Sequence, residues 1–516
     1  MSTPLVLVTG ATGYIGGRLV PELLRAGYRV RVLTRHPPRL EALPWVGQVE
    51  VAKGDVLDGE AVAAATAGVD VAYYLVHSIA SGRRFERTDR AAARTFGGAA
   101  REAGVGRIIY LGGLYPSHQE LSPHLESRKE VGEILLASGV PTIVLRAAVI
   151  IGSGSASFEM LRYLTERLPF MITPRWVSTR IQPIAVRDVL RYLVATAGLP
   201  EGVVGGYDVG GPEVLTYREM MQRYARVAGL PRRLVLPVHV MTPRLSSHWV
   251  GVVTPIPNSL ARPLVASLVN EVIVSDHPVS AIIPDPREGL LGFDRAVELA
   301  LARVREAEVL TRWSGTSAPG APSDPLPSDP DWAGGSLYTD DRSRLVRASP
   351  QTLWRVIEGI GGENGWYSWP LAWAVRGWLD RAAGGPGLAR GRRSPLDLLI
   401  GDSVDWWRVE AVREPTLLRL RAEMRVPGAA WLELHVLQDP VGRTIFRQRA
   451  VFHPRGLLGH LYWAAVAPFH GVVFGGMQRN VALAAQRLER ETVHAERLDR
   501  LEDALLHAEP RAAGTR

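Results

Sequence analysis

The opening stretch of the chain, from Leu5 to Arg35, constrains the fold more than any other part of the sequence. An apolar run rich in β-branched residues ends at Thr9, and the turn Gly10-Ala-Thr-Gly-Tyr-Ile-Gly16 follows it directly. Apolar residues then recur at helical spacing until Gly27, after which a second apolar run begins. This order predicts a strand–helix–strand unit with its glycines in the first turn.

Glycines in such a turn let a dinucleotide pyrophosphate approach the N-terminus of the helix, where free backbone N–H groups and the helix dipole favour an anion. A Cβ atom there would hold the phosphates away. The alternative is a tight turn that holds no nucleotide. We expect the nucleotide to contact the residues of the turn, which are Gly10, Thr12, Gly13, Tyr14, Ile15 and Gly16.

The end of the second strand indicates which dinucleotide binds. NAD sites usually carry a carboxylate there for the ribose hydroxyls, whereas NADP sites carry a cation for the 2′-phosphate. Here the strand ends in Thr34-Arg35-His36. Because the planar guanidinium of Arg35 can bind a phosphate, we expect NADP(H), with NAD(H) as the second option. The alternative is that Arg35 is a solvated surface residue.

Length and composition limit the remaining options. The 516 residues are too many for one core, so we expect two domains and a tail. The absence of cysteine excludes disulfides and thiol chemistry, and we assign no metal site. The net charge of +8 comes from arginines scattered among acidic residues, which argues against nucleic acid as a partner. The N-terminus lacks the features of a signal peptide, so we expect a cytoplasmic protein.

Strands and helices alternate regularly up to Arg146, which predicts an α/β fold with a doubly wound parallel sheet. One of the buried strands, which begins at Asp70, ends in His77-Ser78. Polar residues just beyond the carboxyl end of a parallel strand lie where ligands bind, so both are candidate site residues. The alternative is that His77 only ties down a loop.

The glycine spacing, three residues apart and three again, resembles that of the extended and atypical short-chain dehydrogenase/reductase superfamily. Residues 74–78 and 245–257 are similar to a bacterial branch of NmrA-like proteins, related more distantly to the nucleotide-binding accessory subunit of respiratory complex I. The resemblance implies that Asp55 and Val56 lie against the adenine. An alternative for Asp55 is to cap the helix that begins near Gly59.

Standard members of this superfamily use a TyrxxxLys pair, in which the lysine lowers the tyrosine pKa so that the phenol can exchange a proton with the substrate. Lys129 stands where the resemblance places the lysine, but Leu125 occupies the tyrosine position. The resemblance implies that Lys129 can still bind the nicotinamide ribose. We therefore name Lys129, His77 and Ser78 as candidate catalytic residues and leave the proton donor unassigned.

The second half of the chain predicts a different fold. We expect domains at 1–312 and 336–490, a Pro/Gly/Ser-rich linker or ordered strap at 313–335 and a charged tail at 491–516. A strand, a helix after Ser349, four alternating strands and a helix at about 457–490 resemble the START-like helix-grip fold. Aromatic residues either line a ligand cavity there or form its core; they are Trp366, Trp369, Trp373, Trp378 and the Phe469-His470 pair.

The start of the final helix, from Gly456 to Gly476, is apolar enough to be a transmembrane segment. Its histidines and Pro468, together with the need of the sheet for a covering helix, favour a packed or interfacial helix instead. We expect no transmembrane segment and leave peripheral membrane contact open.

Two functions from different classes fit these observations. The first is an NADP(H)-preferring oxidoreductase acting on an apolar carbonyl or quinone-like substrate. The second is a non-catalytic NADP(H) sensor or assembly factor whose second domain binds a lipid, a quinone or a protein partner. A membrane-associated lipid carrier is a third and weaker interpretation.

Overall fold

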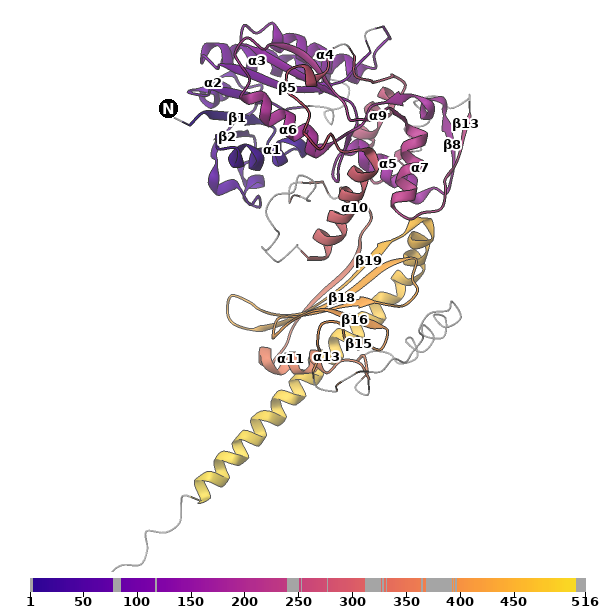
Figure 1. Ribbon diagram of the computed structural model, residues 1–516. Helices are drawn as coiled ribbons and strands as arrows, with labels where there is room; N and C mark the ends of the chain where they lie inside the picture. The colour runs from indigo at the N-terminus through magenta and orange to yellow at the C-terminus, as the bar shows by residue number, and fades with distance from the viewer. Residues whose placement is uncertain are drawn as a thin grey trace, which may run out of the picture. The chain divides into compact units, whose positions relative to one another are not determined.

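The computed structural model describes residues 3–77, 85–116, 118–238, 250–251, 253–275, 277–310, 326, 329–330, 332–362, 365–367, 392, 394 and 397–506. The chain divides into two compact units, Met1–Gly335 and Ser336–Arg516 (Figure 1). Of the sequence-predicted residues, Ser78, Trp369, Trp373 and Trp378 lie outside the described ones.

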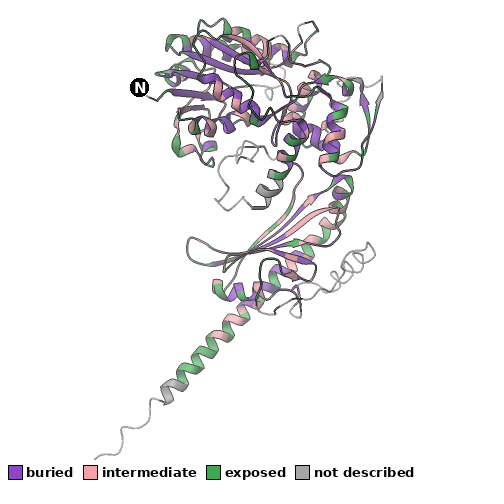
Figure 2. Ribbon diagram, viewed as in Figure 1, coloured by how far each residue is buried: buried purple, intermediate pink, exposed green. Residues whose placement is uncertain are grey.

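The first unit is built on a seven-stranded parallel sheet in the order β11-β6-β5-β4-β1-β2-β3. This confirms the doubly wound α/β fold expected from the sequence. The strands are mostly buried (Figure 2), as parallel strands covered on both faces must be. Their bounds are β1 (Leu5–Thr9), β2 (Arg29–Thr34), β3 (Glu50–Lys53), β4 (Val71–Tyr74), β5 (Arg107–Gly113), β6 (Thr142–Ala147) and β11 (Gly205–Val209).

Alternating side chains of β1 divide the helices between the two faces of this sheet. Val6 and Val8 belong to the core that contains α1 (Tyr14–Arg25) and α6 (Val186–Ala197). Leu5 and Leu7 belong to the core on the other face of the sheet, which includes side chains of three other helices. Those helices are α2 (Gly59–Thr66), α3 (Phe85–Glu102) and α4 (Pro123–Leu136).

The rest of the first unit forms a smaller lobe around its own apolar core. Thr216 and Glu219 form a capping box at the start of α7. The helices are α5 (Ala156–Arg167), η4 (Arg175–Ser178), α7 (Tyr217–Val227), α9 (Asn258–Ser267) and α10 (Phe293–Leu310). The short η1 (Pro37–Leu40), η2 (Val46–Gln48) and η5 (Val279–Ala281) lie elsewhere in the unit. The short strands are β7 (Ile150–Ile151), β8 (Phe170–Pro174), β9 (Arg180–Ile181), β10 (Ile184–Ala185), β12 (Leu215–Thr216) and β13 (Leu234–Val238).

The second unit is a six-stranded antiparallel sheet packed against one long helix, in the strand order β14-β19-β18-β17-β16-β15. Ser349 caps α11 (Pro350–Glu358), as its position before a proline predicts. The final helix, α13 (Gly456–Leu506), is longer than expected and its distal part is mostly exposed (Figure 2). The strands are β14 (Tyr338–Leu345), β15 (Ser403–Val404), β16 (Trp407–Arg413), β17 (Leu417–Ala422), β18 (Gly428–Gln438) and β19 (Thr444–Pro454).

Between this sheet and α13, the described residues enclose only a small cavity. A cavity of about 40 Å³ is lined mainly by aromatic side chains, including Trp407, Trp431 and Trp463. That volume holds a water molecule or two but not a lipid. His470 lines this cavity as expected, but the expectation is wrong for Phe469, which is 64% exposed and does not line it.

Candidate functional site

The glycine turn after β1 leaves the start of α1 open to solvent and ligand. Gly10 has a φ of +73°, and a Cβ atom there would lie 2.7 Å from the Leu75 carbonyl oxygen. A Cβ atom at Gly16 would lie 2.3 Å from the Gly10 carbonyl oxygen. Gly13, the N-cap residue of α1, would meet only that same oxygen, at 3.1 Å. Gly10 and Gly16 therefore allow the strand and helix to pack closely, whereas Gly13 keeps the helix N-terminus clear for an anion.

This turn lies in the middle of a cleft of about 680 Å³ along the carboxyl ends of the parallel strands. The structure brings together in it ten of the twelve sequence-predicted residues: Gly10, Thr12, Gly13, Tyr14, Ile15, Gly16, Arg35, Asp55, Val56 and His77. Ser78 lies outside the described residues, and Lys129 is discussed below. The cleft is the candidate nucleotide site because its position is where open α/β sheets bind ligands.

The end of the cleft beside β2 and β3 is positively charged. Arg35, His36 and Arg39 line it, and the Arg35 guanidinium lies 3.8 Å from the carboxylate of Asp55. Asp55 does not cap α2, because the side chain of Asp58 accepts hydrogen bonds from the first N–H groups of that helix. Arg39 was not among the residues predicted from the sequence, although its position four residues after Arg35, in η1, was a usable signal.

The opposite end of the cleft, beside β4 and β5, is largely apolar. Leu75, Val76 and Leu111 come from the strand ends, and Leu260 comes from α9 in the smaller lobe. Trp332 joins them from the far end of the segment expected to be a linker or strap. Such an arrangement suits a nicotinamide ring and an apolar substrate.

The described part of that segment is packed onto the first unit. The carboxylate of Asp329 forms a buried ion pair of 2.7 Å with Arg18 of α1. The hydroxyl of Tyr163 donates a hydrogen bond to the carbonyl of Trp332 at 2.8 Å. The residues that precede Ser336 thus act as a strap beside the cleft rather than as a free linker.

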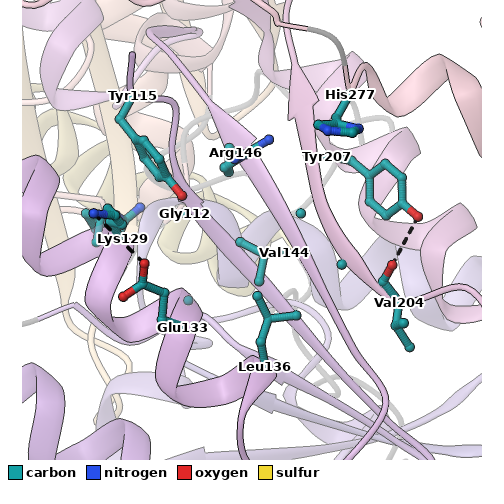
Figure 3. Close-up of a pocket in the computed structure, with 15 residues that line it drawn as sticks. Gly112, Tyr115, Lys129, Glu133, Leu136, Val144, Arg146, Val204, Tyr207 and His277 are labelled. Atoms are coloured by element: carbon teal, nitrogen blue, oxygen red, sulfur yellow. Dashed lines mark hydrogen bonds and ion pairs between the residues drawn. The ribbon is translucent and has the colours of Figure 1, made fainter. Parts of the chain in front are cut away.

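Lys129 does not reach the cleft. Its ammonium pairs with Glu126 at 3.6 Å and with Glu133 at 3.9 Å, and the side chain lines a separate groove of about 560 Å³ (Figure 3). Arg128, one residue earlier on α4, lines the cleft and donates a hydrogen bond to the Leu111 carbonyl at 3.1 Å. The prediction that Lys129 faces the nicotinamide is therefore wrong, because one residue along a helix turns the side chain by about 100°.

His77 lies in the cleft next to a second histidine, His124, which was not among the residues predicted from the sequence. Its Nδ1 is 3.3 Å from the carboxylate of Asp89, and its ring centroid is 5.0 Å from that of His124 on α4. Burial lowers the pKa of His77 and Arg128 lowers it further, although Asp89 opposes both effects. Burial, followed by His77 and Arg128, lowers the pKa of His124 well below its ordinary value.

Together, the parallel sheet, the glycine turn and the cleft define a dinucleotide-binding Rossmann domain. Residues 10–151 match the NAD(P)H-binding protein family. The ceramide reductase of Caulobacter vibrioides is 30% identical over 234 residues, which cover 45% of this chain and 73% of that protein. The chain belongs to this NAD(P)H-binding family of atypical short-chain reductases, which confirms NAD(P)H as the cofactor class.

Two further proteins are similar to parts of this chain. NADH dehydrogenase (ubiquinone) 1 alpha subcomplex subunit 9 of Arabidopsis thaliana is 26% identical over 284 residues, or 52% of this chain and 71% of that protein. The structure of Citrobacter sp. triphenylmethane reductase complexed with NADP(H) is 20% identical and covers 57% of this chain and 99% of its own, with a TM-score of 0.47. Residues 332–477, in contrast, match a family described as proteins of unknown function.

Proposed function

We propose that the protein is an NADP(H)-preferring oxidoreductase that acts on an apolar carbonyl or quinone-like substrate. The observation that carries the preference is the charge at the β2 end of the cleft. Arg35 and Arg39 both line that end, and the strand terminates in Thr34 rather than in a carboxylate. Two guanidinium groups bind a 2′-phosphate well, because each presents a planar set of donors to its oxygens.

The apolar end of the cleft supports the substrate class. Leucine and tryptophan side chains from four separate segments converge there, beside His77 and Arg128. Apolar walls with a few polar groups are typical of sites that orient a hydrophobic ligand by one oxygen atom. The name of the Caulobacter relative, a ceramide reductase, is consistent with a lipid-like substrate for this chain.

Parallel calorimetric titrations of the full chain with NADPH and NADH test the proposal first. We expect NADPH to bind at least about tenfold more tightly, since it gains the charged contacts at Arg35 and Arg39. NADPH oxidation is then followed with a panel of quinones and apolar ketones. Binding of neither nucleotide would overturn the proposal, and equal affinity would remove its NADP(H) preference.

A non-catalytic sensor or assembly factor is the second candidate, and one observation favours it. The position of the usual catalytic tyrosine is occupied by Leu125, which is 6% exposed and packed inside the unit. Because this position carries no phenol, the proton donor on which standard members depend is missing from it. Tight NADPH binding without turnover of any acceptor would favour this function over the enzyme.

The outer face of α13 is the basis for a proposed peripheral contact with membranes. No charged residue occurs between Arg455 and Arg479, a length of about 34 Å at 1.5 Å per residue. Along one side of this stretch lie Leu458, Leu461, Phe469 and Val472, exposed by 71%, 56%, 64% and 63%. Such a face, bounded by arginines, suits the boundary between lipid headgroups and acyl chains.

In the described part of the chain, the Gly456–Leu501 portion of α13 is the one helix whose length and composition would allow a membrane crossing. Its mean hydropathy reaches 1.3 over 18 residues, of which 11% are buried. A single helix of this kind is weak evidence for a span. We propose interfacial rather than transmembrane contact, because the opposite side of the same helix packs on the sheet through Phe474 and Met477.

A further inference from the structure

A cluster of polar side chains from three elements lies at the apolar end of the cleft. His77 follows β4, Asp89 belongs to α3, and His124 and Ser127 belong to α4. The Asp89 carboxylate is 3.3 Å from His77 Nδ1 and accepts a hydrogen bond from the Ser127 hydroxyl at 3.4 Å. The His77 and His124 rings lie with their centroids 5.0 Å apart and their planes at 37°.

The position of His124 on its helix corresponds to that of the missing phenol, shifted by one residue. Arg128 is the α4 residue that lines the cleft, and side chains four residues apart lie on the same face of a helix. The residue four positions before Arg128 is His124, whereas Leu125 pairs in this way with Lys129. The side of α4 that faces the cleft therefore carries an imidazole and a guanidinium, instead of a phenol and an ammonium.

Each imidazole of the pair has one nitrogen left for a ligand. Within the described part of the chain, neither His77 Nε2 nor His124 Nδ1 has a hydrogen-bond partner, and both atoms are shielded from solvent. Buried polar atoms are normally paired, so two unpaired nitrogens at one place indicate a site that a ligand completes. Asp89 holds the other nitrogen of His77, which leaves Nε2 as the atom available for proton exchange.

We propose that His77 exchanges a proton with the substrate oxygen during hydride transfer, and that His124 holds the His77 ring in position. This inference rests on the proposed oxidoreductase function. The bound nicotinamide supplies the hydride in reduction, and the hydride brings its electron pair to the carbonyl carbon. The carbonyl π pair moves to the oxygen, which takes the Nε2 proton of the His77 imidazolium, and the N–H electron pair stays on Nε2. In alcohol oxidation the imidazole form accepts the same proton.

The two histidines have different parts in this step. His77 lines the cleft and is the catalytic residue. His124 acts through His77, because its ring lies against that of His77 at a tilt of 37°. His124 is therefore a positioning residue, and its loss should reduce turnover less than the loss of His77.

Substitution with glutamine tests both assignments, because glutamine keeps a polar side chain but cannot carry the proton. In the full chain, His77→Gln should lower kcat at least about 100-fold and His124→Gln about tenfold, with KM and NADPH affinity changed less than threefold. His118→Gln, an exposed histidine of the same unit, is the matched control and should retain full activity. Imidazole in the buffer should partly restore the activity of His77→Gly.

A second measurement does not depend on finding a substrate. In the histidine-¹⁵N-labelled protein, NADP⁺ should shift the ring resonances of His77 and His124 but not those of His118. Wild-type protein that binds no nucleotide defeats the proposed function itself. Nucleotide binding without any shift of the two resonances, or full turnover by His77→Gln, overturns only the assignment of the histidines.

Discussion

The cleft of the first unit and the interior of the second unit are both spaces beside a β-sheet, yet they differ greatly in volume. The cleft measures about 680 Å³ and the interior cavity about 40 Å³. Glycines form the floor of the cleft at the point where α1 begins, whereas Trp407, Trp431 and Trp463 fill the space under α13. Among the described residues, the first unit therefore has a cleft with room for a dinucleotide, whereas the cavity between the sheet and α13 of the second unit does not.

The largest effect should come from a substitution that fills the space at the glycine turn where the phosphates would bind. Gly13→Val places methyl groups where the phosphates would sit, but its Cβ meets only one protein atom, the Gly10 carbonyl oxygen, at 3.1 Å. We therefore expect a loss of NADPH affinity of at least about 1,000-fold, measured by calorimetry, with the unit still folded. Gly98→Val is the control, because a Cβ there meets nothing within 4 Å. Unaltered affinity would mean that the turn holds no phosphate.

The next largest effect should come from removing a buried side chain of the second unit, which tests whether the core of that unit is tightly packed. Phe446 is fully buried between the sheet and the helices, so Phe446→Ala should lower the free energy of unfolding by about 3–4 kcal/mol. Urea unfolding followed by tryptophan fluorescence measures this loss. Val441→Ala, at a position that is 79% exposed, should change it by less than about 0.5 kcal/mol. A loss below about 1 kcal/mol at Phe446 would indicate a loose interior able to admit a ligand.

A smaller effect should distinguish the two nicotinamide cofactors. Arg35→Asp replaces an attractive contact with a repulsive one, so NADPH affinity should fall about 30-fold and NADH affinity less than threefold. Arg287→Asp, at an exposed position away from the cleft, makes the same change in net charge and should alter neither. Equal weakening of both nucleotides by Arg35→Asp would refute the assignment of the 2′-phosphate to this residue.

The sequence allowed prediction of those parts of the cleft that are local in the chain. The turn from Gly10 to Gly16 and the strand end at Arg35 lie within one strand–helix–strand unit, whose geometry follows from apolar spacing and glycine. Leu260 and Trp332 could not be found in this way, because they reach the cleft only through the tertiary packing of distant segments. Lys129 shows a third case, in which an error of one position on a helix moved the expected group to another face.

The smallest expected effect concerns the outer surface of the second unit. Two glutamates in place of Leu458 and Phe469, which are 71% and 64% exposed, should lower partitioning of the full chain onto phosphatidylcholine–phosphatidylglycerol vesicles about tenfold. Stability should stay nearly unchanged, because neither side chain is buried against the sheet. A flotation assay measures the partitioning.

The same helix provides the matched control for this experiment. Val493 and Leu498 are 55% and 51% exposed, but they lie in the charged distal part of α13. The double variant Val493→Glu/Leu498→Glu adds the same charge to the same helix and should leave partitioning unchanged. If both double variants float like the unaltered chain, the apolar face does not bind lipid. Only the glutamates at Leu458 and Phe469 interrupt the uncharged stretch between Arg455 and Arg479. If both double variants lose binding equally, net charge rather than the apolar face therefore controls the interaction.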